Sequence, residues 1–369
     1  MPAMHRRAAG VLVAATSFLA GCTTYQRFDS VAHLREQFAT QVGSATAAQL
    51  VVPFELDDQV RTALPAHRQS TPDRRLTQVM DLIFEKLRIT YQLAPTRTAV
   101  EAFNTRRGNC LSFVNLFVGL ARNNDLNPFY VEVTDYQKWS HQAGMVVSQG
   151  HIVAGLYLGG ELQTYDFLPY RPKAYRNFHP IDDVQASAHY YNNLGAEALL
   201  DGDVQEARRL IEIASSIAPT FPKALNNLGV IRARTGDTAG AEEAYRRALA
   251  AEPDNSIVMT NMARLLQQAG RGDEAMRMLT SIEASNTSNP YFFVYQADMA
   301  LARGDQKKAL DYMSKALGLD SDSADVHVGL VKVYLALGDT EKARHHLSRA
   351  LSLDATNEEA RRYATMLGR

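Results

Sequence analysis

The C-terminal half of the chain is built on a repeat of 34 residues. Glycine recurs at this interval five times, and an alanine follows each of these glycines after five residues. The glycines are Gly202, Gly236, Gly270, Gly304 and Gly338, and the alanines are Ala207, Ala241, Ala275, Ala309 and Ala343. A period held five times predicts stacked copies of one supersecondary unit, because each unit buries its apolar face against its neighbours.

Small residues at a further fixed offset indicate two closely packed helices in each unit. Ala214, Ala248, Ala316 and Ala350 stand seven residues after these alanines, with Ile282 in the third unit. This pattern resembles the tetratricopeptide repeat (TPR), with five units over about residues 188–357 and an end helix after them. We therefore expect residues 187–369 to form an all-α TPR solenoid.

The resemblance to TPR arrays implies a concave groove that binds a protein partner or an extended peptide. Asn193, Asn227 and Asn261 occupy one equivalent position on successive first helices. Side-chain amides spaced in this way could hydrogen-bond a peptide backbone. The alternative is that asparagine is simply common at this position in the family.

The N-terminus has the layout of a targeting segment. A basic stretch, Met1–Arg7, precedes the apolar Ala8–Ala20, which is too short to span a bilayer. The segment ends in Leu19-Ala20-Gly21-Cys22 and resembles a bacterial lipoprotein signal with its lipobox. The resemblance implies that residues 1–21 are removed and that Cys22 is acylated. Because no Asp follows Cys22, it favours the outer membrane, facing the periplasm. Residues 22–50 are polar and rich in Ala, Gln and Thr, which predicts a tether followed by a short helix.

The chain has two cysteines, Cys22 and Cys110. If Cys22 carries lipid, Cys110 is a lone thiol in an oxidising compartment, so it is either reactive or sheltered. Gly108 suits the positive φ of a sharp turn, and Asn109 is a good N-cap. Apolar residues at helical spacing then predict a buried helix that starts at or just before Cys110. A thiol at that end of a helix is favoured as thiolate, although a small buried cysteine is the alternative.

Two strands, 151–158 and 161–167, are predicted around a Gly159-Gly160 turn, whereas 135–148 reads as irregular. A two-residue turn pairs Leu158 with Glu161, which puts His151 and Asp166 on one face as diagonal neighbours. Alternatively, His151 is a hydrogen-bonded structural histidine and Asp166 a turn residue. His141, in the irregular stretch, is a rival base.

These residues resemble the transglutaminase-like (papain-related) superfamily. The resemblance spans about residues 75–170 and rests on Arg107-Gly108-Asn109-Cys110, Gly150-His151 and Tyr165-Asp166, with gaps of 41 and 15 residues. It implies an α+β papain-like domain over residues 51–186, with Cys110 as nucleophile, His151 as base and Asp166 as the residue that orients it. The chain departs from the family pattern at Ile152-Val153-Ala154, where aromatic residues are usual, and at Leu111-Ser112-Phe113.

The resulting hypothesis is an envelope lipoprotein that cleaves or transfers an amide or peptide bond through a Cys110 thioester. Hydrolysis is favoured over transfer because bulk water competes unless a site excludes it. The competing hypothesis is a non-catalytic TPR scaffold with an inactive thiol domain, and recognition of cell-wall peptides without cleavage is a third. No metal or other cofactor is expected, since one Cys and one His lack the usual zinc ligand count. A net charge of −1 gives no reason to expect nucleic acid as a partner.

Overall fold

The structure is a computed structural model that describes residues 30–64, 70–142, 145–168, 175, 177–284 and 287–368. The side chains of 135–149 and 282–284 lie outside this description. So does the expected lipoprotein signal with Cys22. Within the described residues, no helix combines the length and the apolarity that crossing a bilayer requires.

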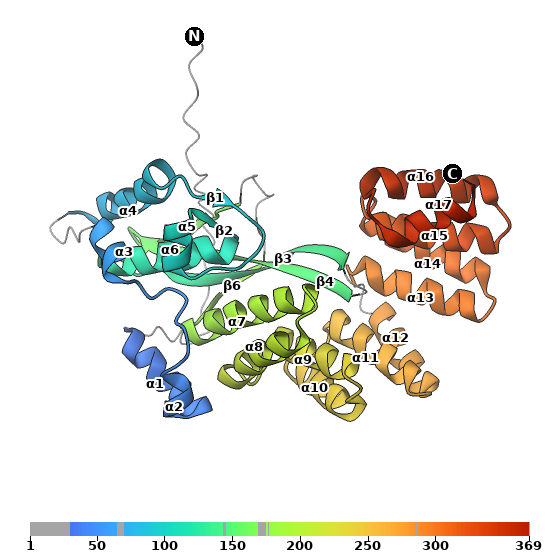
Figure 1. Cartoon of the computed structure of the whole chain (residues 1–369), viewed down its shortest axis with the longest axis horizontal. Helices are drawn as coiled ribbons and strands as arrows, with labels where there is room; N and C mark the ends of the chain where they lie inside the picture. The colour runs from blue at the N-terminus through green and yellow to red at the C-terminus, as the bar shows by residue number, and fades with distance from the viewer. Residues whose placement is uncertain are drawn as a thin grey trace, which may run out of the picture. The chain divides into compact units, whose positions relative to one another are not determined.

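The chain divides into two compact units, residues 1–137 with 149–231, and residues 138–148 with 232–369. The first unit contains a four-stranded sheet of order β5-β4-β3-β6 and a parallel pair, β1-β2 (Figure 1). The strands of these sheets are β1 (Thr90–Tyr91), β2 (Arg107–Gly108), β3 (Phe129–Gln142), β4 (Met145–Leu158), β5 (Glu161–Tyr165) and β6 (Phe178–Ile181), and the division into units cuts β3 and β4 at residues 138 and 148.

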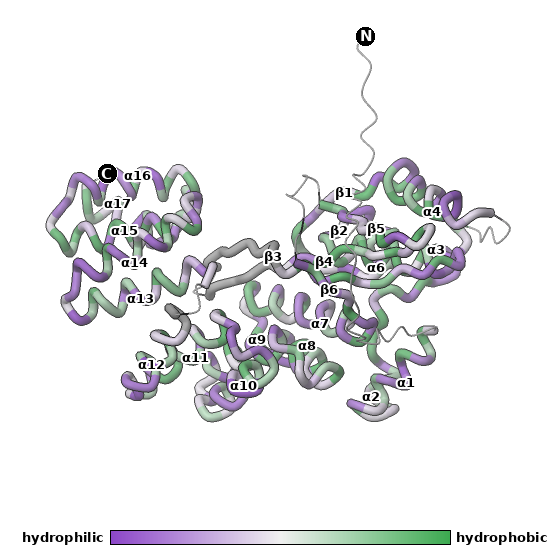
Figure 2. Tube along the Cα trace, turned by 180° about the vertical axis from the view of Figure 1, so that it is seen from behind, coloured by the Kyte–Doolittle hydropathy of each residue, from purple (hydrophilic) through white to green (hydrophobic). Residues whose placement is uncertain are grey.

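Nine helices and one π-helical turn are described in or at the edge of the first unit. They are α1 (Val31–Val42), α2 (Ser44–Ala47), α3 (Asp58–Ala63), α4 (Pro72–Asp81), η1 (Leu82–Lys86), α5 (Ala99–Thr105), α6 (Cys110–Asn123), α7 (Asp183–Leu200), α8 (Val204–Ile217) and α9 (Pro222–Arg234). Helix α6 is mostly apolar along its length (Figure 2) and packs on the sheet, with Phe117 stacked on Tyr165 at 5.3 Å between ring centroids.

The expected tether is partly folded. Residues 31–47 form α1 and α2, and Leu34 and Phe38 are fully buried in the core of the first unit. The Arg35 guanidinium donates a hydrogen bond of 2.8 Å to the Glu55 carboxylate. These contacts attach this stretch to the domain that follows it.

The region between Thr134 and His151 is wrongly predicted as irregular. There β3 runs on to Gln142, and β4 starts at Met145 rather than at the predicted His151. The turn prediction is confirmed: Leu158 pairs with Glu161 and Ala154 with Tyr165. Gly159 and Gly160 have φ values of 60° and 87°, which is the backbone of a type I′ turn.

The repeat region is a helical TPR solenoid, as predicted. Its remaining helices are α10 (Thr238–Ala251), α11 (Ser256–Gln268), α12 (Gly272–Ala284), α13 (Pro290–Ala302), α14 (Gln306–Leu319), α15 (Ala324–Ala336), α16 (Thr340–Leu353) and α17 (Glu358–Met366). The five periodic glycines have φ between 78° and 86° at the turn inside each unit, and the five alanines that follow are fully buried. The period therefore marks left-handed turn residues and helix contact points.

The first repeat, α7 and α8, shares a hydrophobic core with the residues that precede it. Leu210, Ala214 and Ile217 of α8 belong to the same buried cluster as Phe38 of α1 and Leu111 of α6. The repeat pattern begins near residue 187, but the compact unit that contains α6 extends to Ile231.

Candidate active site at the start of helix α6

The turn that leads into α6 is held by the parallel pair β1-β2. Thr90 pairs with Arg107 and Tyr91 with Gly108. The left-handed residue of this turn is Arg106, with φ 54°, and Gly108 does not have positive φ. The prediction of positive φ at Gly108 is therefore wrong. Glycine is needed there for space, because a Cβ would lie 2.6 Å from the Ser112 Cβ.

Helix α6 begins at Cys110, as predicted, with Asn109 as its N-cap. The Asn109 side-chain oxygen accepts hydrogen bonds from the Ser112 backbone N–H at 3.0 Å and from the Ser112 hydroxyl at 2.9 Å. The next eleven residues of the helix, 111–121, are buried, whereas Cys110 itself is partly exposed. The thiol therefore lies where the helix dipole is positive.

His151 and Asp166 meet as the hairpin register predicts. His151 Nε2 lies 2.9 Å from Asp166 Oδ1, and the His151 side chain is 1% exposed. The carboxylate also accepts a hydrogen bond of 2.5 Å from the Tyr175 hydroxyl and one of 3.0 Å from the Leu168 N–H. Nε2 is thereby engaged with Asp166, and the His151 ring also hydrogen-bonds the Cys110 side chain.

Charges in the site favour a protonated imidazole. Burial opposes the charge, but hydrogen bonds to Asp166 and Cys110, with the charges of both groups, raise the pKa of His151 to about 9. Burial likewise opposes the charge of Asp166, yet His151 and the Tyr175 hydroxyl hold the pKa of its carboxyl below the ordinary value.

The structure thus brings Cys110, His151 and Asp166 together, and it adds Tyr175. No sequence pattern pointed to Tyr175, because its role depends on a single hydrogen bond to Asp166. The backbone of the rival base His141 lies in β3, and its side chain is outside the description. Among the described residues, no group of three or more His, Cys, Asp or Glu side chains is arranged to hold a metal ion.

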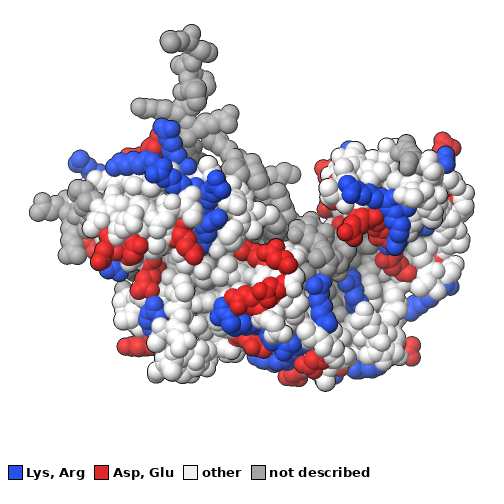
Figure 3. Space-filling view, viewed as in Figure 1, with Lys and Arg blue, Asp and Glu red and all other residues white. Residues whose placement is uncertain are grey.

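The surface beside the site is basic. Arg88, Arg106 and Arg107 are exposed, and β1-β2 pairing brings them together from two segments of the chain. No ion pair within the described residues involves these three side chains. Lys and Arg side chains gather over this part of the unit, around α4, α5 and β1 (Figure 3).

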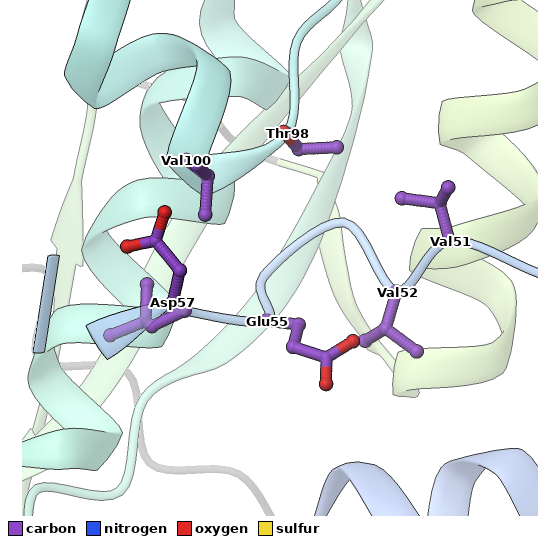
Figure 4. A pocket seen from close by; sticks show the side chains of 7 residues that line it. Val51, Val52, Glu55, Asp57, Thr98 and Val100 are labelled. Atoms are coloured by element: carbon purple, nitrogen blue, oxygen red, sulfur yellow. The ribbon is translucent and has the colours of Figure 1, made fainter. Parts of the chain in front are cut away.

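A pocket in the same unit does not include the three candidate catalytic residues (Figure 4). It is lined by Val51, Val52, Glu55, Leu56, Asp57, Thr98 and Val100. Its carboxylates already have partners in the fold: Glu55 pairs with Arg35 at 2.8 Å and Asp57 caps α3.

The asparagines proposed for the TPR groove lie on first helices, as the period requires. Asn193 is on α7, Asn227 on α9 and Asn261 on α11, and each is half-buried. The Asn227 amide donates a hydrogen bond of 2.9 Å to the Asn192 side-chain oxygen. Peptide binding by these three residues stays a prediction.

Comparison with known proteins identifies the two parts of the chain. Residues 62–172 match the transglutaminase-like superfamily. Residues 185–256, 232–293 and 300–367 match tetratricopeptide repeat families. The chain therefore contains a transglutaminase-like domain followed by TPR repeats.

Relatives share only parts of the chain. It is 35% identical over 101 residues to cellulose synthase operon protein C of Xanthomonas axonopodis pv. citri, covering 27% of this chain and 7% of that protein. The protein of the same name from Pseudomonas fluorescens is 25% identical over 163 residues, covering 42% and 12%. The chain thus spans about a tenth of the length of these relatives. A thermophilic TPR protein of Thermus thermophilus superposes with a TM-score of 0.44 at 23% identity, covering 49% of this chain and 100% of that one.

Proposed function

We propose that the transglutaminase-like domain is a cysteine hydrolase that cleaves an amide or peptide bond through a thioester on Cys110. The observation that carries this proposal is His151, whose ring binds Asp166 at 2.9 Å and also interacts with the half-buried Cys110 at the start of α6. Three separate segments of the chain are needed to assemble this group.

The chemistry follows from the protonation of the site. The Cys110 thiolate attacks the carbonyl carbon, and the Cys110 backbone N–H at the helix start stabilises the oxyanion. The His151 imidazolium gives its proton to the departing amine, which leaves an acyl thioester on Sγ. Water then attacks the thioester as His151 accepts its proton, and the acid leaves as the thiolate and imidazolium are restored.

The test uses p-nitrophenyl acetate as a generic acyl donor. The wild-type protein is expected to release p-nitrophenolate with turnover and to gain one acetyl group on Cys110, measured by mass spectrometry. Cys110→Ala abolishes both signals, and Asp166→Asn slows turnover because the imidazole loses the carboxylate that orients it. Acetylation of Cys110 no faster than that of a denatured control would refute the hydrolase and favour a non-catalytic scaffold.

The basic surface supports an acyl donor that carries negative charge. Arg107 precedes Cys110 by three residues, so its backbone lies within about 10 Å of the nucleophile. Glutamyl p-nitroanilides with a free side-chain carboxylate are therefore expected to react faster than lysyl ones, and Arg106→Glu with Arg107→Glu to reverse the preference. Equal rates in both proteins contradict a role for these arginines.

The N-terminal pattern supports anchoring through Cys22 to the periplasmic face of the outer membrane, and the repeats support a protein or peptide partner. Metabolic labelling with palmitate tests the anchor: wild-type protein is expected to incorporate label and Cys22→Ser is not. A label retained in Cys22→Ser contradicts lipidation at this residue.

A further inference from the structure

A chain of hydrogen bonds runs from the first TPR repeat to the N-cap of α6. Glu197, on α7, accepts hydrogen bonds from the Thr96 backbone N–H at 2.9 Å and from the Thr96 hydroxyl at 2.8 Å. The Thr96 hydroxyl oxygen in turn accepts a hydrogen bond of 2.7 Å from the Asn109 amide. Two hydrogen bonds therefore connect the repeat to Asn109, the N-cap residue directly before Cys110.

This network determines how the Asn109 amide is oriented. Its nitrogen donates to Thr96 and to the Leu93 carbonyl oxygen at 3.2 Å, so its oxygen is the atom that faces α6. That oxygen accepts from the Ser112 N–H, which is the bond that caps the helix. Thr96 and Asn109 are 2% and 6% exposed, so water cannot replace a lost partner freely.

The loop that carries Thr96 has further hydrogen bonds to α6, and its Leu93 carbonyl oxygen is a second acceptor for the Asn109 amide. The Ser112 hydroxyl oxygen accepts from the Arg97 N–H at 2.8 Å, and the Asn115 amide donates to the Arg97 carbonyl oxygen at 3.1 Å. These bonds hold residue 97 on the helix. Thr96 links the Asn109 amide to the carboxyl group of Glu197.

We propose that Glu197 of the first TPR repeat is a positioning residue for Cys110, which it acts on through Thr96 and the Asn109 N-cap. The repeat then sets the direction of the first N–H groups of α6 and the place of the thiol relative to His151. This inference rests on the proposed hydrolase for its activity readout, but not for its thiol readout.

The test compares Glu197→Ala with Tyr191→Phe, a control on the same helix. The Tyr191 hydroxyl accepts a hydrogen bond of 2.7 Å from the Val51 N–H, so the control also removes a contact between α7 and the domain but leaves Thr96 intact. Iodoacetamide modification of Cys110 is followed from pH 5 to 10, with thermal unfolding measured for each variant.

Glu197→Ala is expected to slow Cys110 alkylation at neutral pH about tenfold and to lower kcat for p-nitrophenyl acetate with little change in KM. Tyr191→Phe is expected to leave both unchanged. Thr96→Val, which removes the linking hydroxyl, is expected to reproduce the Glu197→Ala effect, and Thr96→Ser to restore the wild-type profile.

A merely structural Glu197 gives a different result: lower thermal stability, with the alkylation profile and kcat of the wild type in both Glu197→Ala and Thr96→Val. That result overturns the proposal. If the wild-type protein shows no turnover, the alkylation profiles decide alone, so failure of the hydrolase and failure of the positioning role remain distinguishable. If Glu197→Ala does not fold, the alkylation rates of Thr96→Val and Thr96→Ser test the positioning role in its place.

Discussion

At the scale of single residues, the site depends on groups that change each other's protonation. Burial alone disfavours a charged His151, yet Asp166 and Cys110 overcome it, and the Tyr175 hydroxyl shares the Asp166 carboxylate. The hairpin register was sufficient to predict that His151 and Asp166 meet, and the family resemblance added Cys110 to them. It was not sufficient to find Tyr175, because one hydroxyl in a loop leaves no periodic pattern.

The first prediction concerns the titration of His151. NMR of its ring is expected to show a midpoint near pH 9, and Cys110→Ser and Asp166→Asn are each expected to lower it. Because this pKa lies above that of the unfolded chain, the stabilisation is complete below about pH 6.5 and is lost as the pH rises through about 9. A wild-type midpoint near 6.5 contradicts the ion pair.

A second prediction concerns two histidines of the last repeat. Burial, and then the nearby His327 and His345, lower the pKa of His346 to about 4, and its Nδ1 lies 3.0 Å from Nδ1 of His327. A histidine with a depressed folded pKa binds its proton more readily when unfolded, so stability falls as the pH drops from about 6.5 to about 4. Urea unfolding of the full chain at pH 7 and pH 4.5 measures this loss. His346→Phe is expected to reduce it, and an unchanged loss rejects the assignment.

At the scale of elements, glycine is required for two different reasons: the backbone conformation of a turn, or close packing against a neighbouring side chain. The Gly159-Gly160 turn follows from its own two residues, since only glycine takes both positive φ values at low cost. Gly108 looked similar in the sequence, but the requirement there comes from Ser112, one turn into α6. Local conformation was therefore predictable at the first site and misleading at the second.

The third prediction is that Gly108→Ala destabilises the first unit. Its Cβ would meet the Ser112 Cβ at 2.6 Å, and relieving this overlap has a cost of about 1–3 kcal/mol. Gly318→Ala is the control, because nothing lies within 4 Å of its Cβ, and alanine in α14 is expected to stabilise by about 0.5–1 kcal/mol. Chemical denaturation measures both values. No loss in Gly108→Ala means that the turn before α6 can shift.

At the scale of the whole molecule, the first repeat belongs to the unit that carries the candidate site. Besides Glu197 and Tyr191, α7 supplies Asp183, which is fully buried and accepts hydrogen bonds of 2.7 and 2.8 Å from Arg122 of α6. The repeat pattern alone suggested a solenoid that starts after a complete domain. The contacts make α7 a part of that domain.

The fourth prediction is that Arg122→Leu lowers the free energy of unfolding by about 3–5 kcal/mol, because it leaves the buried Asp183 carboxylate unpaired. The matched control is Arg209→Leu, which removes the exposed pair with Glu206 and is expected to change stability by less than about 1 kcal/mol. Denaturant unfolding of both variants gives the comparison. Similar small losses in both variants would show that Asp183 finds another hydrogen-bond partner.

The sequence by itself determined the repeat architecture, the start of α6 at Cys110 and the hairpin that joins His151 to Asp166. Each follows from a local rule: a fixed period, a cap, or a two-residue turn that sets strand register. Only the tertiary structure decided that Arg122 meets Asp183 and that Thr96 meets Glu197, across 61 and 101 residues of chain. Such contacts depend on how helices pack once formed, and no short-range pattern encodes them.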